Sequence, residues 1–140
     1  MVDNDIFRNC NYYDVDELSN HSSKVGLFQN ASCLSLNFCS FSHKYDAFCD
    51  MLNKLNFAFD VIVLTETWLL DNAADLLKID GYTMFSKQRP GSKSGRGGGI
   101  CVFVKNSHQA KVINPQFVTT SFEHLVIKIN SELFKEDIVV

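Results

Sequence analysis

The chain has 140 residues, of which 46% are hydrophobic and 21% are charged, and its formal net charge is −3. These values are typical of one globular domain, or of part of a larger one, that buries a core without disulfides or metal ions. The negative charge argues against a protein that coats nucleic acid. The sequence also lacks an apolar run long enough to span a membrane, and its polar N-terminus does not resemble a signal peptide.

The first 30 residues are rich in Asn, Asp and Ser and show little hydrophobic periodicity, so we expect a flexible or extended lead-in at 1–30. The remaining residues, 31–140, carry the patterns of a folded domain. Residues 31–36 alternate small or polar with apolar side chains, which predicts a strand, and Asn37 follows at its end.

A helix is predicted after this strand and extends to about Asn56. Ser40 and Ser42 are candidate caps for its N-terminus. The apolar residues that predict it recur at spacings of three and four, and they are Tyr45, Phe48, Leu52 and Leu55.

Residues 59–65 form a second predicted strand, which is apolar throughout its middle and is therefore expected to be covered on both faces. Strand, helix and buried strand make a βαβ unit, so the two strands should be parallel. Parallel strands end at the same edge of a sheet, where open α/β sheets bind their ligands. We therefore expect Asn37 and Glu66, which follow the two strands, to lie in one crevice.

The second half of the chain predicts mostly antiparallel strands at 81–85, 99–105, 122–129 and 134–140. A polar-apolar connection at 69–77, a long turn at 88–98 and a tight turn at 130–132 join the predicted elements. The predicted fold class is therefore α/β, a βαβ unit followed by antiparallel strands.

Glu66 is the strongest candidate for chemistry, because an apolar strand delivers its carboxylate to the sheet edge. Mg²⁺ prefers oxygen ligands, usually one or two carboxylates with water completing its shell. The alternative is a structural glutamate that accepts hydrogen bonds from backbone amides at the start of a loop. Asn37 also has a functional and a structural interpretation. It is either a neutral oxygen ligand, or a hydrogen-bond donor to a phosphate or to a neighbouring carboxylate, or else a turn-forming residue at the end of a strand.

Other segments have weaker signals. No Asp or Glu occurs from Gly81 to Phe122, and that stretch forms either an anion-binding surface or the solvated face of a hairpin. Its glycine run, 95–99, is no phosphate-binding loop, although Arg96 is a candidate for a phosphate contact.

Trp68 and Tyr82 are candidates for base stacking or, in preference, for core packing. The five cysteines lack a Cys-x-x-Cys pair, so we expect reduced thiols in an intracellular protein and no zinc site; they are Cys10, Cys33, Cys39, Cys49 and Cys101.

Four segments in order resemble motifs of the endonuclease/exonuclease/phosphatase superfamily, as found in the endonuclease domains of non-LTR retrotransposons. Leu34-Ser-Leu-Asn37-Phe-Cys-Ser40 resembles the first-strand motif, which usually reads Leu-Asn-Ile-Arg-Ser-Leu. Phe59-Asp-Val-Ile-Val-Leu-Thr-Glu66-Thr-Trp-Leu69 closely resembles the second-strand motif. The run Gly81-Tyr-Thr and the run Arg96-Gly-Gly-Gly-Ile-Cys-Val-Phe-Val-Lys105-Asn resemble the hairpin that follows. The resemblance covers about residues 31–140.

This resemblance implies a four-layer, DNase I-like α/β sandwich and Mg²⁺-dependent cleavage of a phosphodiester. In such elements the DNA is nicked so that a reverse transcriptase, expected downstream in the same polypeptide, can prime from the freed end. Glu66 would be the metal-binding carboxylate, and Asn37 the active-site residue that supports it. DNA is the implied partner, no membrane is involved, and nuclear action is implied by the family alone.

Two departures qualify this expectation. Cys39 stands where the family usually has Arg. The family's other catalytic groups (a Tyr, an Asp-x-Asn pair and a Ser-Asp-His segment) would follow Val140, so we expect an incomplete N-terminal fragment that binds metal weakly and cleaves poorly. The alternatives are a non-catalytic remnant or weak binding module and, with a poorer fit, a phosphatase of the same superfamily.

Overall fold

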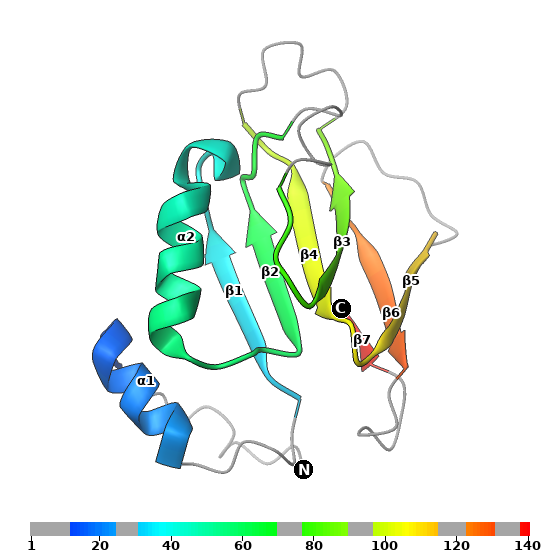
Figure 1. Ribbon diagram of the computed structural model, residues 1–140. Coiled ribbons are helices and arrows are strands. Elements are labelled where there is room, and N and C mark those ends of the chain that lie inside the picture. The colour runs from blue at the N-terminus through cyan, green and yellow to red at the C-terminus, as the bar shows by residue number, and fades with distance from the viewer. Residues whose placement is uncertain (1–11, 25–30, 70–76, 90–96, 115–122, 131–137) are drawn as a thin grey trace, which may run out of the picture.

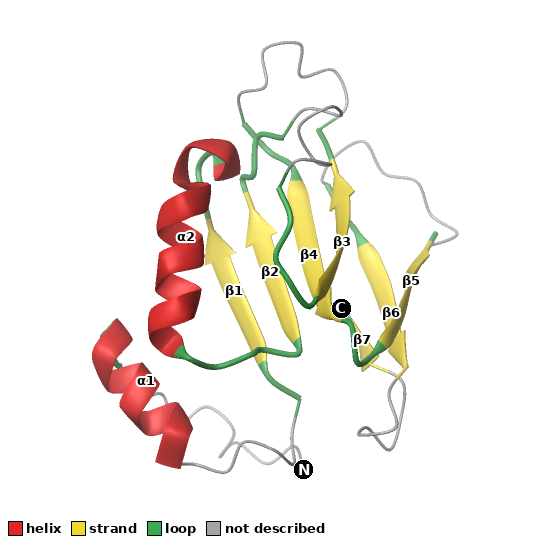
Figure 2. Ribbon diagram, in the orientation of Figure 1, coloured by secondary structure: helices red, strands yellow, loops and turns green. Residues whose placement is uncertain are grey.

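The computed structural model describes residues 12–24, 31–69, 77–89, 97–114, 123–130 and 138–140. Within these ranges the chain forms two helices and two β-sheets (Figures 1 and 2). No helix in the described ranges is long and apolar enough to cross a membrane.

The first sheet has the strand order β1-β2-β4-β3. Strands β1 (Cys33–Asn37) and β2 (Val61–Thr65) are parallel neighbours, and α2 (Phe41–Leu55) connects them. The predicted βαβ unit is thereby confirmed. Strand β4 (Ile100–Lys105) runs antiparallel to both β2 and β3 (Tyr82–Lys87).

The two central strands of this sheet are covered on both faces, as the apolar run of β2 predicted. Their side chains alternate, so that every second residue faces α2 and the others face the second sheet. The core on the α2 side contains, among others, Phe41, Phe48, Ile62, Leu64, Cys101 and Phe103. The core on the other side contains Val61, Val102, Val104, Ile127 and Ile129.

The second sheet has the order β5-β6-β7 and is antiparallel throughout. Its strands are β5 (Gln109–Ile113), β6 (Val126–Asn130) and β7 (Ile138–Val139). Strand β6 packs against the first sheet through Ile127 and Ile129, which are fully buried. The layers are therefore α2, the first sheet and the second sheet (Figure 1).

Helix α1 (Val15–Lys24) lies in the segment for which the sequence predicted only a flexible or extended lead-in. It begins with a capping box, in which Asp14 accepts a hydrogen bond from the Glu17 backbone N–H at 2.8 Å and Glu17 accepts one from the Asp14 backbone N–H at 3.1 Å. The Ser19 hydroxyl bonds to carbonyls at the end of α2, at Lys54 and Leu55. The cap and the bonds to α2 therefore stabilise the helix.

Several predicted bounds need adjustment. Strand β5 was not predicted. Helix α2 ends at Leu55, close to the predicted end, and Asn56 is its C-cap in the left-handed conformation. The predicted starts of β6 at 122 and of β7 at 134, the tight turn after Asn130 and most of the two long connections fall outside the described residues.

Candidate functional site

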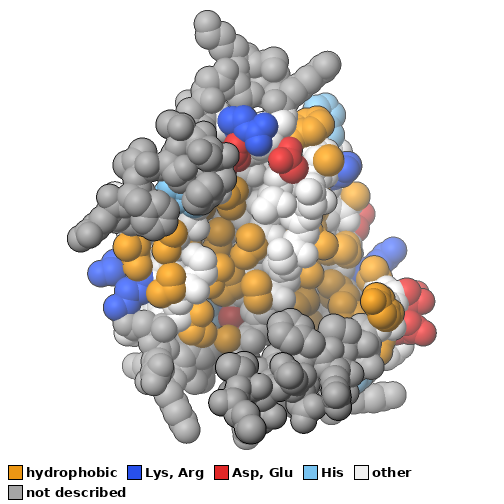
Figure 3. All heavy atoms as spheres, turned by 180° about the vertical axis from the view of Figure 1, so that it is seen from behind, with side chains coloured by type: hydrophobic (Ala, Val, Ile, Leu, Met, Phe, Trp, Pro, Cys, Tyr) orange, Lys and Arg blue, Asp and Glu red, His pale blue; other side chains and the backbone are white. Residues whose placement is uncertain are grey.

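The segments that contain the candidate site residues Asn37 and Glu66 lie at one end of the molecule. Strands β1, β2 and β3 end there, and β4 and β6 begin there (Figure 1). Seen from behind, acidic and basic side chains meet at this end (Figure 3).

The two parallel strands bring Asn37 and Glu66 to the same edge, as the sequence predicted. Asn37 lies opposite Thr65 in the register, and Glu66 is the next residue of the chain. The pairing continues beyond the strands, because Phe38 N–H donates to Thr65 O at 2.9 Å and Ser40 N–H donates to Glu66 O at 3.0 Å. The backbone around both candidate residues is therefore fixed by hydrogen bonds.

The loops at this edge contain non-glycine residues in the left-handed region of backbone space. Glu66 has a φ of 53° and Trp68 a φ of 54°, and after β1 both Cys39 and Ser40 also have positive φ. Such conformations cost about 1–3 kcal/mol each and persist only where the surroundings impose them. Their concentration beside Asn37 and Glu66 is typical of a functional edge.

The two carboxylate oxygens of Glu66 have different surroundings. Oε2 accepts hydrogen bonds from Gly98 N–H at 2.7 Å and from the Trp68 indole N–H at 3.0 Å. Oε1 accepts no hydrogen bond from any described residue and faces Arg89 Nη2 at 4.0 Å. One oxygen thus orients the side chain and the other is open to a ligand.

Glu66 is held in its ionised form. The hydrogen bond from Gly98 N–H, followed by that from Trp68, lowers the pKa of the Glu66 carboxyl below its ordinary value, and the charge of Arg89 acts in the same direction. An ionised oxygen is what a hard divalent cation requires. Glu66 also has the structural role that the sequence left open, because it accepts a hydrogen bond from the backbone N–H of Gly98.

A second carboxylate, that of Glu123, lies just before β6. We call Glu66, Arg89 and Glu123 the Glu66 cluster. Its Oε2 accepts a hydrogen bond from Gly99 N–H at 2.7 Å, and its Oε1 forms an ion pair with Arg89 Nε. This bond to Glu123 raises the pKa of Arg89, so its guanidinium stays charged. Two adjacent glycine amides therefore bond to two different glutamates, with Arg89 between them.

Gly98 has to be a glycine for this arrangement to form. Its φ is +76°, and a Cβ atom placed on it would lie 2.5 Å from Arg89 Nε and 2.5 Å from Glu123 Oε1. Gly98 therefore lets the side chains of Arg89 and Glu123 approach the backbone closely.

Sequence reasoning missed Glu123 and gave Arg89 no individual role. The only available signal for Glu123 was its position as the first acidic residue after the basic stretch from Gly81 to Phe122. Arg96, for which a phosphate contact was considered, lies outside the described residues.

Asn37 is exposed and keeps most of its hydrogen-bonding capacity. Among the residues that the structure describes, its Oδ1 receives only a long contact from the Cys39 thiol, at 3.8 Å. No hydrogen bond joins Asn37 to Glu66 among the described residues, so any cooperation between them depends on a ligand. The Cys39 side chain is also exposed, in the loop after β1.

The side chains at this edge fit a hard divalent cation in donor type. Glu66 Oε1 and Asn37 Oδ1 are an ionised and a neutral oxygen, and Mg²⁺ commonly combines one or two carboxylates with water. The described residues contain no group of three or more His, Cys, Asp or Glu side chains arranged to hold a metal ion. The described residues therefore supply at most part of the coordination shell of a metal ion.

Trp68 and Tyr82, the two candidates for stacking, have structural contacts. Trp68 is partly buried and bonds to Glu66, whereas the Tyr82 hydroxyl donates to Phe59 O at 2.7 Å. The four cysteines that the structure describes are free thiols, in agreement with the expectation from their spacing.

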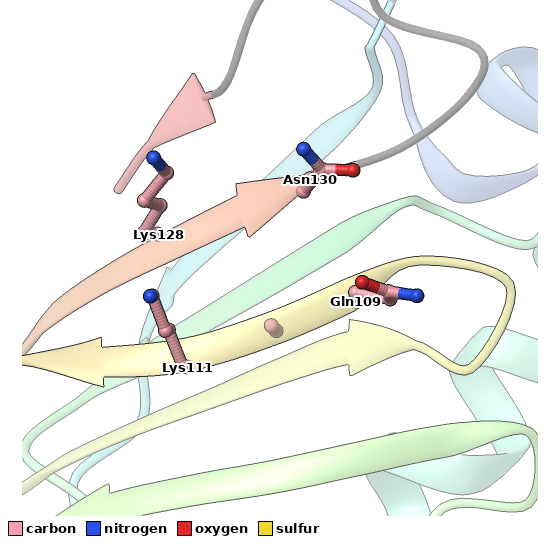
Figure 4. A pocket seen from close by; sticks show the side chains of 5 residues that line it. Gln109, Lys111, Lys128 and Asn130 are labelled. Atoms are coloured by element: carbon pink, nitrogen blue, oxygen red, sulfur yellow. The ribbon is translucent and has the colours of Figure 1, made fainter.

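Two hollows formed by described residues lie away from Asn37 and Glu66. One has a volume of about 360 Å³ on the second sheet, where Lys111 and Lys128 point to the same side from neighbouring strands (Figure 4). The other, of about 450 Å³, lies at the start of β3 around Gly81. Neither contains a residue of the Glu66 cluster.

No protein-family model and no curated protein matches the chain.

Proposed function

We propose that the chain is part of a Mg²⁺-dependent endonuclease domain of a non-LTR retrotransposon, which nicks DNA before reverse transcription. Glu66 is the metal ligand, and Asn37 assists it. The observation that carries the proposal is an ionised, oriented carboxylate with one open oxygen, at the shared carboxyl edge of two parallel strands. DNA and a reverse transcriptase domain are the partners that this function implies.

The fold supports this assignment at a coarse level. A helix layer on a mixed sheet, backed by an antiparallel sheet, corresponds to three adjacent layers of the four-layer α/β sandwich that the resemblance implies. We propose that architecture for the complete domain.

The side chains of this chain would bind and orient the reacting groups. Gly98 and Trp68 fix Oε2 of Glu66, so that Oε1 presents its negative charge outward. The exposed amide of Asn37 can donate to a phosphate oxygen or coordinate through Oδ1. A bound Mg²⁺ would polarise a phosphoryl oxygen and stabilise the leaving oxygen.

Cleavage also needs a base or an oriented water, and neither proposed residue supplies one. Glu66 is committed to the metal, and the amide of Asn37 does not accept a proton at neutral pH. General-base catalysis contributes about 10²–10⁴-fold. Without this contribution, nicking by the chain is expected to stay near background.

The proposal is tested by nicking of supercoiled plasmid in the presence and absence of imidazole, which supplies a base from solution. In ordinary buffer with Mg²⁺, the wild-type chain should match Glu66→Ala. With imidazole and Mg²⁺, the wild type should nick faster than Glu66→Ala, and a chelator should remove the difference.

Two other outcomes are informative. If the wild type never exceeds Glu66→Ala under any of these conditions, the endonuclease assignment fails and the non-catalytic module is favoured. If Glu66-dependent nicking occurs without imidazole, the chain carries its own base and the proposed division of roles is wrong.

A further inference from the structure

Arg89 is the cation nearest to the open oxygen of Glu66 in the described part of the chain. It follows β3 and reaches across to the start of β6, where its Nε bonds to Glu123. Its Nη2 lies 4.0 Å from Glu66 Oε1, which is too far for a hydrogen bond. The outer edge of the guanidinium is therefore directed toward the candidate metal site without being bonded to it.

The position of this guanidinium is fixed by its neighbours. Glu123 holds Nε and is itself held by Gly99 N–H at 2.7 Å, and its side chain is only 17% exposed. The guanidinium also lies over the glycine run, since a Cβ on Gly97 would lie 3.2 Å from Nη1. A guanidinium that is held in place loses little conformational entropy when it binds an anion.

The accessible part of Arg89 has donors to spare. The side chain is 49% exposed, and a guanidinium has five N–H donors, of which the described contacts occupy only those directed at Glu123. Two parallel N–H donors match the geometry of a phosphate oxygen pair, which explains why arginine is common where phosphates are bound.

On the basis of the proposed function, we propose that Arg89 binds the phosphate group of the nucleic-acid substrate beside Glu66, and that Glu123 is the residue that positions it. Without a metal, Glu66 and the phosphate compete for the same guanidinium. The assignment concerns a phosphodiester in DNA, because that is the substrate of the proposed reaction.

The experiment measures binding of a short fluorescent DNA duplex in EDTA by anisotropy over a range of salt concentrations. Arg89→Gln should bind about tenfold more weakly, because one charge-assisted pair is lost. Its slope of log K against log salt should fall by about one. Glu123→Gln, which keeps an acceptor for Gly99 N–H, should weaken binding by a smaller factor. Arg89→Lys should keep most of the salt slope and recover part of the affinity.

Two matched variants make the test specific. Lys111→Gln removes one positive charge from β5, on the second sheet, and should leave affinity almost unchanged. Glu66→Gln should bind on the order of fivefold more tightly without metal, because it removes a negative charge 4.0 Å from Arg89. Circular dichroism confirms folding, and Arg89→Lys decides the question if Arg89→Gln does not fold.

The proposal is overturned if the wild type does not bind the duplex, or if Arg89→Gln binds as well as the wild type. It is also overturned if Lys111→Gln causes an equal loss, since binding would then depend on overall charge. A parallel Mg²⁺ titration separates the two proposals: Arg89-dependent duplex binding without Glu66-dependent Mg²⁺ binding contradicts the proposed function and leaves this inference intact.

Discussion

At the residue scale, Glu66 has the structural role that its sequence context left open, and its geometry is compatible with the proposed role as a metal ligand. Oε2 accepts the bonds that a structural glutamate at a loop start would accept, from Gly98 and from Trp68. Oε1 is left to face the cluster of charges around Arg89. A carboxylate fixed through one oxygen presents the other in a defined direction, which reduces the entropy lost when a ligand binds.

The close approach at Gly98 gives a prediction with an internal control. Gly98→Ala places a Cβ against Arg89 and Glu123 and also forces a left-handed φ on an alanine. Gly81→Ala imposes a similar φ, +83°, but the added Cβ would meet no atom within 4 Å. We expect Gly81→Ala to lower the free energy of unfolding by about 1–2 kcal/mol. Gly98→Ala should lower it by up to about 1 kcal/mol more, because the partly exposed ion pair of Arg89 and Glu123 has to shift.

Urea denaturation of the two variants measures this difference. Equal losses of unfolding free energy would mean that Arg89 and Glu123 move aside without cost. The proposal that Glu123 positions the Arg89 guanidinium would then be unsupported.

At the scale of elements, the central strands and α2 could be predicted because their apolar residues follow clear periods. Strands β2 and β4 carry apolar runs, and α2 has its stripe at spacings of three and four. Strand β5 has a weaker signal, because polar and apolar residues alternate over only four positions, 109–112, and Val112 is 47% exposed. For α1, the capping-box residues Asp14 and Glu17 were visible in the sequence, but the helix contains only two apolar residues, Val15 and Leu18.

The candidate site was predictable only in part, for a related reason. Asn37 and Glu66 could be placed together because strand ends follow from local patterns and parallel pairing. Their partners could not, because Gly98 is 32 residues from Glu66, and Glu123 is 34 residues from Arg89. Such contacts depend on how the two sheets pack, which no local pattern encodes.

At the other end of the first sheet, a buried polar cluster ties three segments together. Asp60, just before β2, accepts hydrogen bonds from the backbone and hydroxyl of Ser32, both at 2.8 Å, and contacts His108 Nε2 at 2.9 Å. The His108 side chain is fully buried and that of Asp60 is 14% exposed. The cluster links the segment before β1, the start of β2 and the turn between β4 and β5.

This cluster predicts a pH dependence of stability. Burial alone would raise the pKa of Asp60, but the bonds from the Ser32 backbone, His108 and the Ser32 hydroxyl outweigh it, so that the pKa is lowered. A lowered carboxyl pKa stabilises the fold above the unfolded value of about 3.9, and this contribution is lost as the pH falls through the folded value. Asp60→Asn should therefore cost about 1–3 kcal/mol at neutral pH and progressively less below about pH 4.

Denaturation of wild type and Asp60→Asn at neutral and at acidic pH measures this effect. Asp50→Asn, at an exposed position of α2, is the matched control for the change in net charge. A difference between wild type and Asp60→Asn that is independent of pH would show that the charge of Asp60 contributes nothing.

At the scale of the whole molecule, the proposed site and the buried polar cluster of Asp60 lie at opposite ends of the first sheet. The end where β1 and β2 terminate holds Asn37, Glu66 and the Arg89 contacts, whereas the Asp60 cluster closes the end where β2 begins. The strands between them are covered by α2 on one face and by the second sheet on the other. Strand ends projecting from a rigid, doubly covered sheet are well suited to hold a polar site in a fixed geometry.

The central claim is that Glu66 binds a divalent cation, and Trp68 offers a direct probe of it. Trp68 is the only tryptophan of the chain, so its indole N–H, which donates to Glu66 Oε2 at 3.0 Å, gives a single signal in a ¹H–¹⁵N spectrum. Titration with Mg²⁺ at constant ionic strength should shift this signal to saturation in the wild type. Glu66→Gln keeps an acceptor for the indole but loses the charge, and should show no such shift. An indole signal that ignores Mg²⁺, or that shifts equally in Glu66→Gln, would contradict the account.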